Sequence, residues 1–229
     1  GHFESAGEWG AEDRRAAAEL LHGEEGGGNA ALALHFESLC RGLPFKNDAF
    51  LLVDYPGYGE CAGDPDPAGI RANVKDAVKL AAFRLKLDLA AKPDSLLLFG
   101  HSLGCAAALF AVEEFGCRAA VLGAPFTSTL EMAQLRLGVD KNYPIQNRFD
   151  HRVPHALFAK NGGRAWILHG DRDEVIPLSM SQSLAREYPA VVKLYSIPRA
   201  GHNDLFRRGR DELLLAFIAA RAHAPKEKP

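Results

Sequence analysis

The sequence predicts an α/β protein built on a doubly wound, mostly parallel sheet. Short apolar runs recur along the chain, and most of them lack the polar alternation of a half-exposed strand, which is typical of strands buried on both faces. Helical patterns separate these runs, so each connection has to cross over a face of the sheet. The expected strands are residues 50–53, 95–99, 119–122, 165–169 and 191–197.

Helical segments follow from the spacing of apolar residues and from their end signals. The second segment stops at Gly116 and the third stops before Pro189, both of which are common ways to end a helix. The expected helices are residues 70–85, 103–115, 178–188 and 211–221.

No internal repeat or linker divides the 229 residues, so we expect a single domain over residues 1–229. Two regions of this domain are irregular. Residues 1–30 form an atypical N-terminal segment rich in Gly, Glu and Ala, in which residues 16–21 indicate a helix. Residues 126–160 combine separated aromatic residues, prolines and no long period, which indicates a small excursion above the sheet.

Composition and charge argue against several classes of partner. The chain has a formal net charge of −2, with 47% hydrophobic and 24% charged residues, so nothing favours nucleic acid. The longest apolar run, residues 213–220, is too short to cross a bilayer, and we expect no integral membrane segment. The 4 cysteines include no C-x-x-C pair, which is typical of free thiols in a reducing compartment, and we expect a cytoplasmic protein.

A serine between two glycines is the first candidate for chemistry. The stretch "GHSLG", residues 100–104, lies between an expected strand and an expected helix, and a sharp turn there exposes the hydroxyl of Ser102 at the carboxyl edge of the sheet. The start of the following helix offers N–H groups and the positive end of the helix dipole. A serine is unreactive without a base, and the base needs an orienting acid. The alternative is that Ser102 is only a helix N-cap.

The chain supplies an acid and a base in the required order. Asp171 and Asp173 follow the fourth expected strand, and His202 follows the fifth. All of them therefore leave the sheet at the edge where Ser102 lies, and open α/β folds bind their ligands at that edge. We favour Asp173 as the acid because it lies deeper in its loop, whereas Asp171 adjoins the strand end and is suited to cap a turn.

Other reactive side chains near these segments have structural explanations. His101 belongs to the serine turn itself, and His169 lies inside an expected strand, where a neutral, hydrogen-bonded core histidine is the usual outcome. Cys105 follows the serine in a helix of small residues and is interpreted as a packing residue.

Two ligand-binding patterns are discounted. Gly57 and Gly59 have the dinucleotide spacing directly after a strand, but prolines interrupt the helix that would have to follow them. His151 and His155 have the spacing of zinc ligands on a helix, but Pro154 lies between them, so we interpret them as two loop imidazoles. The sequence therefore predicts neither a metal nor a cofactor.

From about residue 50 onward the sequence resembles the α/β-hydrolase superfamily, and more closely its compact abhydrolase-domain serine hydrolases, the esterases and thioesterases without a large lid. Five stretches carry the resemblance in order: "VDYPGYGECAG", the nucleophile elbow "GHSLG", "APFTS", "HGDRDEVIP" and "AGHNDL". The resemblance implies the α/β-hydrolase fold, a three-layer sandwich, with a catalytic triad of Ser102 as nucleophile, Asp173 as acid and His202 as base. It also implies that the backbone N–H of Leu103 lies in the oxyanion hole.

The N-terminal part departs from this pattern. The group takes its second oxyanion donor from a loop after a His-Gly pair, which ends an earlier strand upstream of the tyrosine-glycine turn. Here His22-Gly23 lies ahead of Asp54 by about the distance that separates the pair from this turn in the group. This match implies that the N–H of Glu24 is the second donor. Residues 16–21 indicate a helix and not a strand, so either the front of the fold is shortened or the match arises by chance.

We therefore expect a serine hydrolase that cleaves carboxylic or thioester bonds through an acyl-enzyme on Ser102. Its substrate would be a small-molecule acyl ester or thioester. Phe126, Met132 and Leu135 are candidate walls of the acyl pocket, although the same residues are suited to packing on the sheet. Two alternatives stay open, namely a peptidase or amidase of the same fold and a catalytically weak hydrolase fold used for binding.

Overall fold

A computed structural model of the chain describes residues 2–4, 16–19, 36–45, 48–89 and 92–223. The described residues form a seven-stranded sheet in the order β1-β3-β2-β4-β5-β6-β7. β1 runs antiparallel to β3, and all other neighbours run parallel. The strands are β1 (His2–Glu4), β2 (Ala16–Glu19), β3 (Ala49–Leu52), β4 (Leu96–His101), β5 (Ala119–Gly123), β6 (Arg164–Gly170) and β7 (Val192–Ile197). The predicted doubly wound, mostly parallel sheet is confirmed.

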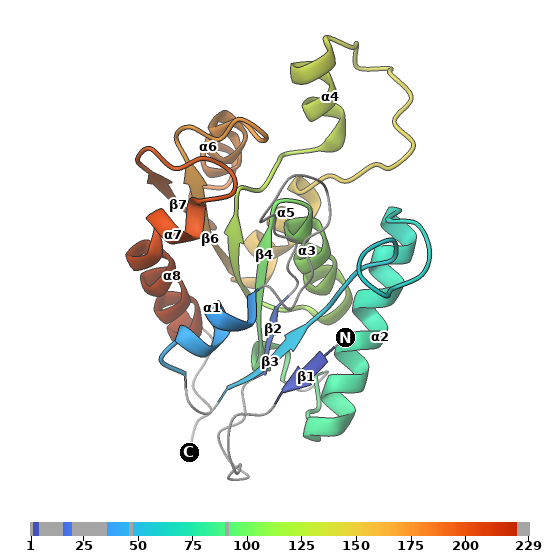
Figure 1. Ribbon diagram of the computed structural model, residues 1–229, viewed down its shortest axis with the longest axis vertical. Coiled ribbons are helices and arrows are strands. Elements are labelled where there is room, and N and C mark those ends of the chain that lie inside the picture. Colours follow the sequence, from blue (N-terminus) through green and yellow to red (C-terminus); the bar gives the residue numbers. More distant parts are fainter. Residues whose placement is uncertain (1, 5–15, 20–35, 46–47, 90–91, 224–229) are drawn as a thin grey trace.

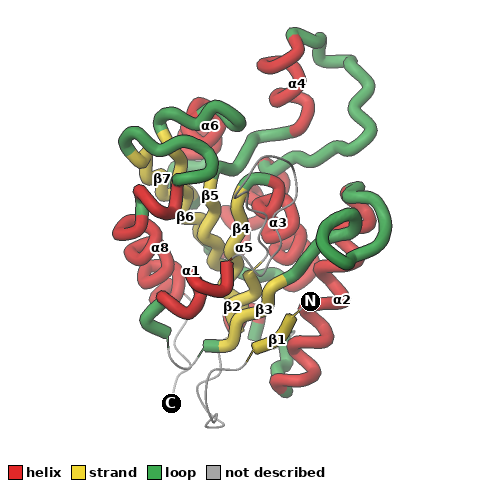
Figure 2. The backbone as a smooth tube through the Cα atoms, viewed as in Figure 1, coloured by secondary structure: helices red, strands yellow, loops and turns green. Residues whose placement is uncertain are grey.

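Helices cover both faces of this sheet and make a three-layer sandwich (Figure 1, Figure 2). Successive residues of a strand point to opposite faces, so Leu98 packs in the core on the α3 side while its neighbour Phe99 packs in the core on the α8 side. Burial of both faces explains why these strands lack polar alternation. One layer contains α1 (Glu37–Gly42), α7 (Leu205–Arg208) and α8 (Arg210–His223), and the other contains α2 (Pro67–Leu85), α3 (Leu103–Phe115), α5 (Arg152–Asn161) and α6 (Leu178–Glu187).

The N-terminal part corrects one prediction. Residues 16–19, the described part of the alanine-rich stretch 16–21, do not form the expected helix, because they are the strand β2. This strand lies between β3 and β4 and pairs with both, so that Ala17 stands opposite Phe50 on one side and Leu97 on the other. Two ladders satisfy the backbone N–H and C=O groups on both edges of β2, and this tertiary pairing outweighs the weak preference of alanine for helix. The front of the sheet is therefore present.

Residues 126–160 divide between two places. α4 (Thr129–Leu137) and the loop after it stand out beyond the carboxyl edge of the sheet (Figure 1), whereas α5 packs against α3 and β6. The interpretation of two loop imidazoles is wrong, since His151 is the N-cap of α5 and His155 lies within that helix. Pro154 is tolerated there because it occupies the first turn, where an N–H has no partner inside the helix.

The connection after β3 is a turn and not the opening of a helix. β3 ends at Leu52, and α2 begins only at Pro67, after Asp66 has capped it by accepting a hydrogen bond from Gly69 N at 2.8 Å. Gly57, in the dinucleotide-like spacing, lies within this turn at a φ of +86°. No helix dipole therefore stands behind these glycines to hold a pyrophosphate, in agreement with the interpretation from the prolines.

Two further features concern the whole described part of the chain. Among the described ranges, no helix combines the length and the apolar character that crossing a bilayer requires. The cysteines at positions 40, 61, 105 and 117 are free thiols, as predicted.

Candidate active site

Ser102 joins the end of β4 to the start of α3 in a strained backbone turn. Its φ is 55° and its ψ is −122°, a conformation that residues with a side chain rarely adopt. Ser102 N donates to Gly123 O at the end of β5 at 2.9 Å, and Cys105 N donates to Ser102 O at 3.0 Å. The Ser102 side chain makes no capping hydrogen bond to α3, so an N-cap role does not account for this serine.

Gly100 and Cys105 pack closely around this turn. A Cβ on Gly100 would lie 2.6 Å from Gly104 C and 2.8 Å from Cys105 N, so a larger residue would push the turn apart. The buried thiol of Cys105 donates to Gly100 O at 3.3 Å and to Gly123 O at 3.2 Å. Burial raises the pKa of this thiol well above its ordinary value. Cys105 is therefore a packing residue, as its sequence context predicts.

Asp173 lies in the loop after β6, and its side chain is 0% exposed. Oδ1 accepts hydrogen bonds from Val175 N at 2.9 Å and Ile176 N at 2.7 Å, while Oδ2 accepts from His202 Nδ1 at 2.8 Å. Burial alone would raise the pKa of this carboxyl, but the hydrogen bonds from His169, His202 and the backbone outweigh burial and hold the pKa well below its usual range. Asp173 is therefore ionised near neutral pH.

Asp171, the other acid of this loop, has a different environment. Its Oδ1 accepts a hydrogen bond from Arg199 N at 2.6 Å in an exposed turn after β7. This contact is the turn-capping arrangement that its place at the strand end predicts. Of the two acids in this loop, Asp173 thus accepts a hydrogen bond from a histidine and Asp171 accepts one from a backbone N–H.

His202 lies in the loop after β7 and is 7% exposed. With Nδ1 donating to Asp173, the neutral ring presents Nε2 as an acceptor, which is the tautomer that a general base needs. The ring packs against that of His101, with the centroids 4.7 Å apart, and His101 immediately precedes Ser102 in the chain. The structure therefore brings His202 against the turn that carries the serine.

A second histidine contacts the same carboxylate. His169, on β6, places Nε2 3.4 Å from Asp173 Oδ2 and 2.8 Å from Ile176 O, and its Nδ1 lies 2.6 Å from Ser181 Oγ. It is buried and hydrogen-bonded, as predicted, but the sequence analysis missed its contact with the acid. The signal was the short, tight loop "HGDRD", which returns Asp173 to the residue that precedes the loop.

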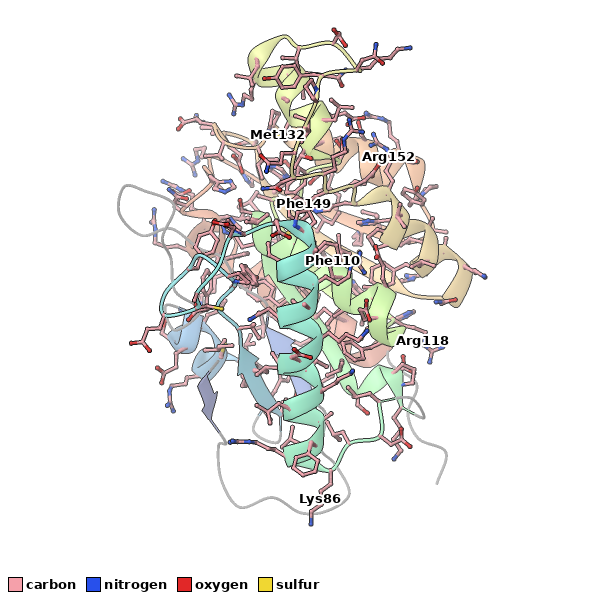
Figure 3. All side chains as sticks on the ribbon, turned by 90° about the vertical axis from the view of Figure 1, so that its right-hand side faces the viewer. Lys86, Phe110, Arg118, Met132, Phe149 and Arg152 are labelled. Carbon is pink, nitrogen blue, oxygen red and sulfur yellow. The ribbon has the colours of Figure 1, made fainter. Side chains whose placement is uncertain are left out.

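The three candidate pocket walls lie in different surroundings. Phe126 is 5% exposed and stacks on His151, with ring centroids 4.1 Å apart. Met132 is partly buried and packs against the core cluster that contains Phe149; both residues are labelled in Figure 3. Leu135 is 60% exposed on α4. The structure thus groups Phe126 and Met132 with one core cluster and leaves Leu135 at the surface.

The expected oxyanion donors lie partly within the described residues. Leu103 is the first residue of α3, so its N–H has no partner inside the helix. Glu24 lies outside the described residues. β2, however, ends at Glu19, which stands opposite Phe99 of β4. A strand therefore lies ahead of His22-Gly23 in the chain, and the pair itself lies outside the described residues.

Comparison with known proteins shows the family to which this chain belongs. Residues 20–160 of the 229 match the profile of the alpha/beta hydrolase family, which is more than half of the chain. The chain belongs to this family. The match includes the Ser102 turn, whereas Asp173 and His202 lie beyond its end. The contact between Asp173 and His202 in this alpha/beta hydrolase thus comes from the geometry and not from the profile.

Relatives of this alpha/beta hydrolase among curated proteins are distant. YfhR of Escherichia coli K12, an uncharacterized protein, is 28% identical over 199 residues, which cover 83% of this chain and 65% of YfhR. Human alpha/beta hydrolase domain-containing protein 17C is 27% identical over 155 residues, which cover 66% of this chain and 43% of that protein. The chain therefore spans less than two thirds of the length of these relatives.

Solved structures share the fold of this alpha/beta hydrolase at low sequence identity. Esterase 2 of Thermogutta terrifontis has a TM-score of 0.64 at 17% identity, covering 99% of this chain and 91% of that chain. Est1E of Butyrivibrio proteoclasticus, solved with ferulic acid bound, has a TM-score of 0.65 at 18% identity, covering 96% and 94%. XC6422 of Xanthomonas campestris, a serine hydrolase without a lid, has a TM-score of 0.60 at 14% identity, covering 93% and 84%.

Proposed function

We propose that this alpha/beta hydrolase is a serine hydrolase that cleaves carboxylic or thioester bonds through an acyl-enzyme on Ser102. The observation that carries the proposal is the 2.8 Å hydrogen bond between His202 Nδ1 and Asp173 Oδ2. The His202 ring packs on His101, which directly precedes the strained Ser102 in the chain. A buried carboxylate that fixes the tautomer of a histidine next to a serine is an arrangement that activates a hydroxyl.

In the proposed reaction His202 Nε2 takes the proton of the Ser102 hydroxyl while the oxygen attacks the acyl carbon. The oxyanion that forms accepts hydrogen bonds from the N–H of Leu103 and from the N–H of Glu24. His202 then returns the proton to the departing alcohol or thiol, which leaves the acyl group on Ser102. A water molecule, deprotonated by His202 in its turn, hydrolyses the acyl-enzyme and restores the free serine.

Asp173 supplies orientation and charge in this scheme. It holds His202 in the tautomer that leaves Nε2 free to accept the proton, and its negative charge stabilises the imidazolium that forms. Because hydrogen bonds outweigh burial and hold the pKa of Asp173 well below its usual range, the carboxylate does not itself take up the proton.

A small-molecule acyl ester or thioester is the proposed substrate. Solved structures with this fold include an esterase and a protein that holds ferulic acid, a small carboxylic acid, which supports this choice. Phe126, Met132 and Leu135 are the proposed walls for the acyl group. An apolar wall contributes binding in proportion to the acyl surface that it covers.

The direct test labels the protein with a fluorophosphonate probe and locates the adduct by mass spectrometry. We expect an adduct on Ser102 in the wild type, none in Ser102→Ala, and full labelling in Ser196→Ala, a control whose serine is exposed on β7. Turnover of aryl esters, acyl thioesters and aminoacyl amides then assigns the bond that is cleaved. A folded wild-type protein without an adduct would refute the proposal and favour a binding role, and preferred amide turnover would favour a peptidase or amidase.

A further inference from the structure

The carboxylate of Asp173 has two histidine neighbours. His202 Nδ1 lies 2.8 Å from Oδ2, and His169 Nε2 lies 3.4 Å from the same oxygen. His202 adjoins the serine turn, whereas His169 is 0% exposed within the sheet. We propose that His169, held by Ser181, is a positioning residue that keeps Asp173 aimed at His202. This inference rests on the serine hydrolase proposed above.

The surroundings of His169 define which of its nitrogens carries hydrogen. Nε2 faces two oxygens that only accept, Ile176 O at 2.8 Å and the ionised carboxylate of Asp173, so Nε2 is an N–H. Nδ1 lies 2.6 Å from Ser181 Oγ. In the neutral ring Nδ1 accepts, and the Ser181 hydroxyl donates to it. The other acceptor near that hydroxyl, Pro125 O, is farther away at 3.5 Å.

This N–H closes the acid loop on itself. Ile176 uses both of its backbone groups, since its N–H donates to Asp173 Oδ1 at 2.7 Å and its C=O accepts from His169 at 2.8 Å. His169 thereby ties the end of β6 to the far side of the loop that begins there. Asp173 lies between these two points, and a side chain held from both sides has little freedom to turn away from His202.

A neutral donor beside Asp173 suits the proposed reaction better than a cation would. A second cation against Oδ2 would cancel the charge that Asp173 offers to the imidazolium of His202. A neutral donor fixes the geometry and leaves that charge in place.

Three variants separate positioning from simple core packing. His169→Leu removes the donor and keeps an apolar side chain, His169→Gln retains an N–H near the place of Nε2, and Ser181→Ala removes the hydroxyl but keeps the imidazole. Ser183→Ala, on the same helix, is the matched control. We expect His169→Leu to lower kcat about 10- to 100-fold with KM changed less than about twofold, and His169→Gln to recover most of that loss.

The pH profile provides a readout that lost packing would not move. In His169→Leu we expect the acidic limb of kcat/KM to move to lower pH, because a misaligned carboxylate stabilises the imidazolium of His202 less. Ser181→Ala should move it in the same direction by a smaller amount. A lower profile with an unmoved midpoint in both variants would overturn the positioning role, since it would report only a smaller active fraction.

A second measurement does not depend on turnover and covers the case in which His169→Leu folds poorly. The proton of His202 Nδ1, hydrogen-bonded to a buried carboxylate, is observable by NMR, and we expect it to exchange with water faster in Ser181→Ala than in Ser183→Ala. Equal exchange would overturn the inference even if the wild type labels at Ser102. Faster exchange in Ser181→Ala, together with no labelling of the wild type, would reject the serine hydrolase and leave the His169 contact supported.

Discussion

Asp173 and His202 meet at 2.8 Å although they follow two different strands, β6 and β7. These strands are parallel neighbours whose last paired residues are Gly170 and Ile197. A Cβ on Gly170 would lie 2.7 Å from Ala200 C, so the two loops leave the sheet with their backbones in close contact. The contact between Asp173 and His202 therefore follows from the register of the strands and not from long, flexible loops.

Replacing Asp173 by the isosteric Asn should abolish most of the activity. The amide presents a donor where the carboxylate accepts, so His202 loses the tautomer that leaves Nε2 free, and we expect kcat to fall by roughly 10³- to 10⁴-fold. Steady-state kinetics with an aryl ester measures this loss. The matched control is Asp171→Asn, which touches only a turn and should stay within about twofold of the wild type. Equal losses in both variants would contradict the assignment of the acid.

Gly100→Ala should damage the serine turn. The added Cβ would lie 2.6 Å from Gly104 C and 2.8 Å from Cys105 N, which are backbone atoms that cannot move aside without displacing α3. We expect a loss of about 1–3 kcal/mol in the free energy of unfolding and a larger relative loss of labelling at Ser102. Gly42→Ala is the control, because a Cβ there meets nothing within 4 Å. Normal labelling in Gly100→Ala would show that the turn tolerates the displacement.

Acidification should destabilise the protein below about pH 6.5, the ordinary pKa of histidine. Burial and the neighbouring His155 lower the pKa of His151 to about 3, and burial lowers the pKa of His155 to about 4. As the pH falls, these rings take up protons in the unfolded chain before they do so in the folded protein. Their contribution to the free energy of unfolding is therefore complete above the unfolded pKa and is lost as the pH falls toward the folded pKa values. The slope should reach about 1.4 kcal/mol per pH unit for each histidine.

Urea unfolding between pH 7.5 and pH 4.5 measures this slope. His151→Phe cannot take up a proton, so its stability should fall less steeply than that of the wild type over the same range. Parallel curves for the wild type and His151→Phe would show that the ring of His151 is not what couples folding to pH.

The second oxyanion donor is testable by removing one N–H. Glu24→Pro deletes the backbone donor that the resemblance implies, and the loss of such a donor typically lowers kcat by about 10²- to 10³-fold. Glu25→Pro is the matched control one residue farther along the chain. Similar activities for the two variants would place the second donor elsewhere.

The serine turn was predictable because its determinants are local. A buried strand, two flanking glycines and a helix of small residues all lie within "FGHSLGCAAALF", and each of them restricts the backbone without help from distant residues. The preference for Asp173 over Asp171 also came from position along one loop, and the structure pairs Asp173 with His202.

β2 was not predictable, because its strand conformation depends on distant neighbours. Alanine favours helix in isolation, and only the ladders to β3 and β4 reverse that preference. The contact between His169 and Asp173 was missed for a related reason. A histidine in a buried strand needs hydrogen-bond partners, but their identity depends on how the following loop folds back.

Ser102 N donates a hydrogen bond to Gly123 O, and Asp173 and His202 lie in the loops that follow β6 and β7. Three pairs of neighbouring parallel strands, β4–β5, β5–β6 and β6–β7, therefore have to form before the proposed triad exists. A chain in which β7 has not yet docked holds the serine but lacks its base. Reactivity toward a fluorophosphonate during refolding would therefore report when β7 docks, because labelling would rise only after β7 has paired with β6.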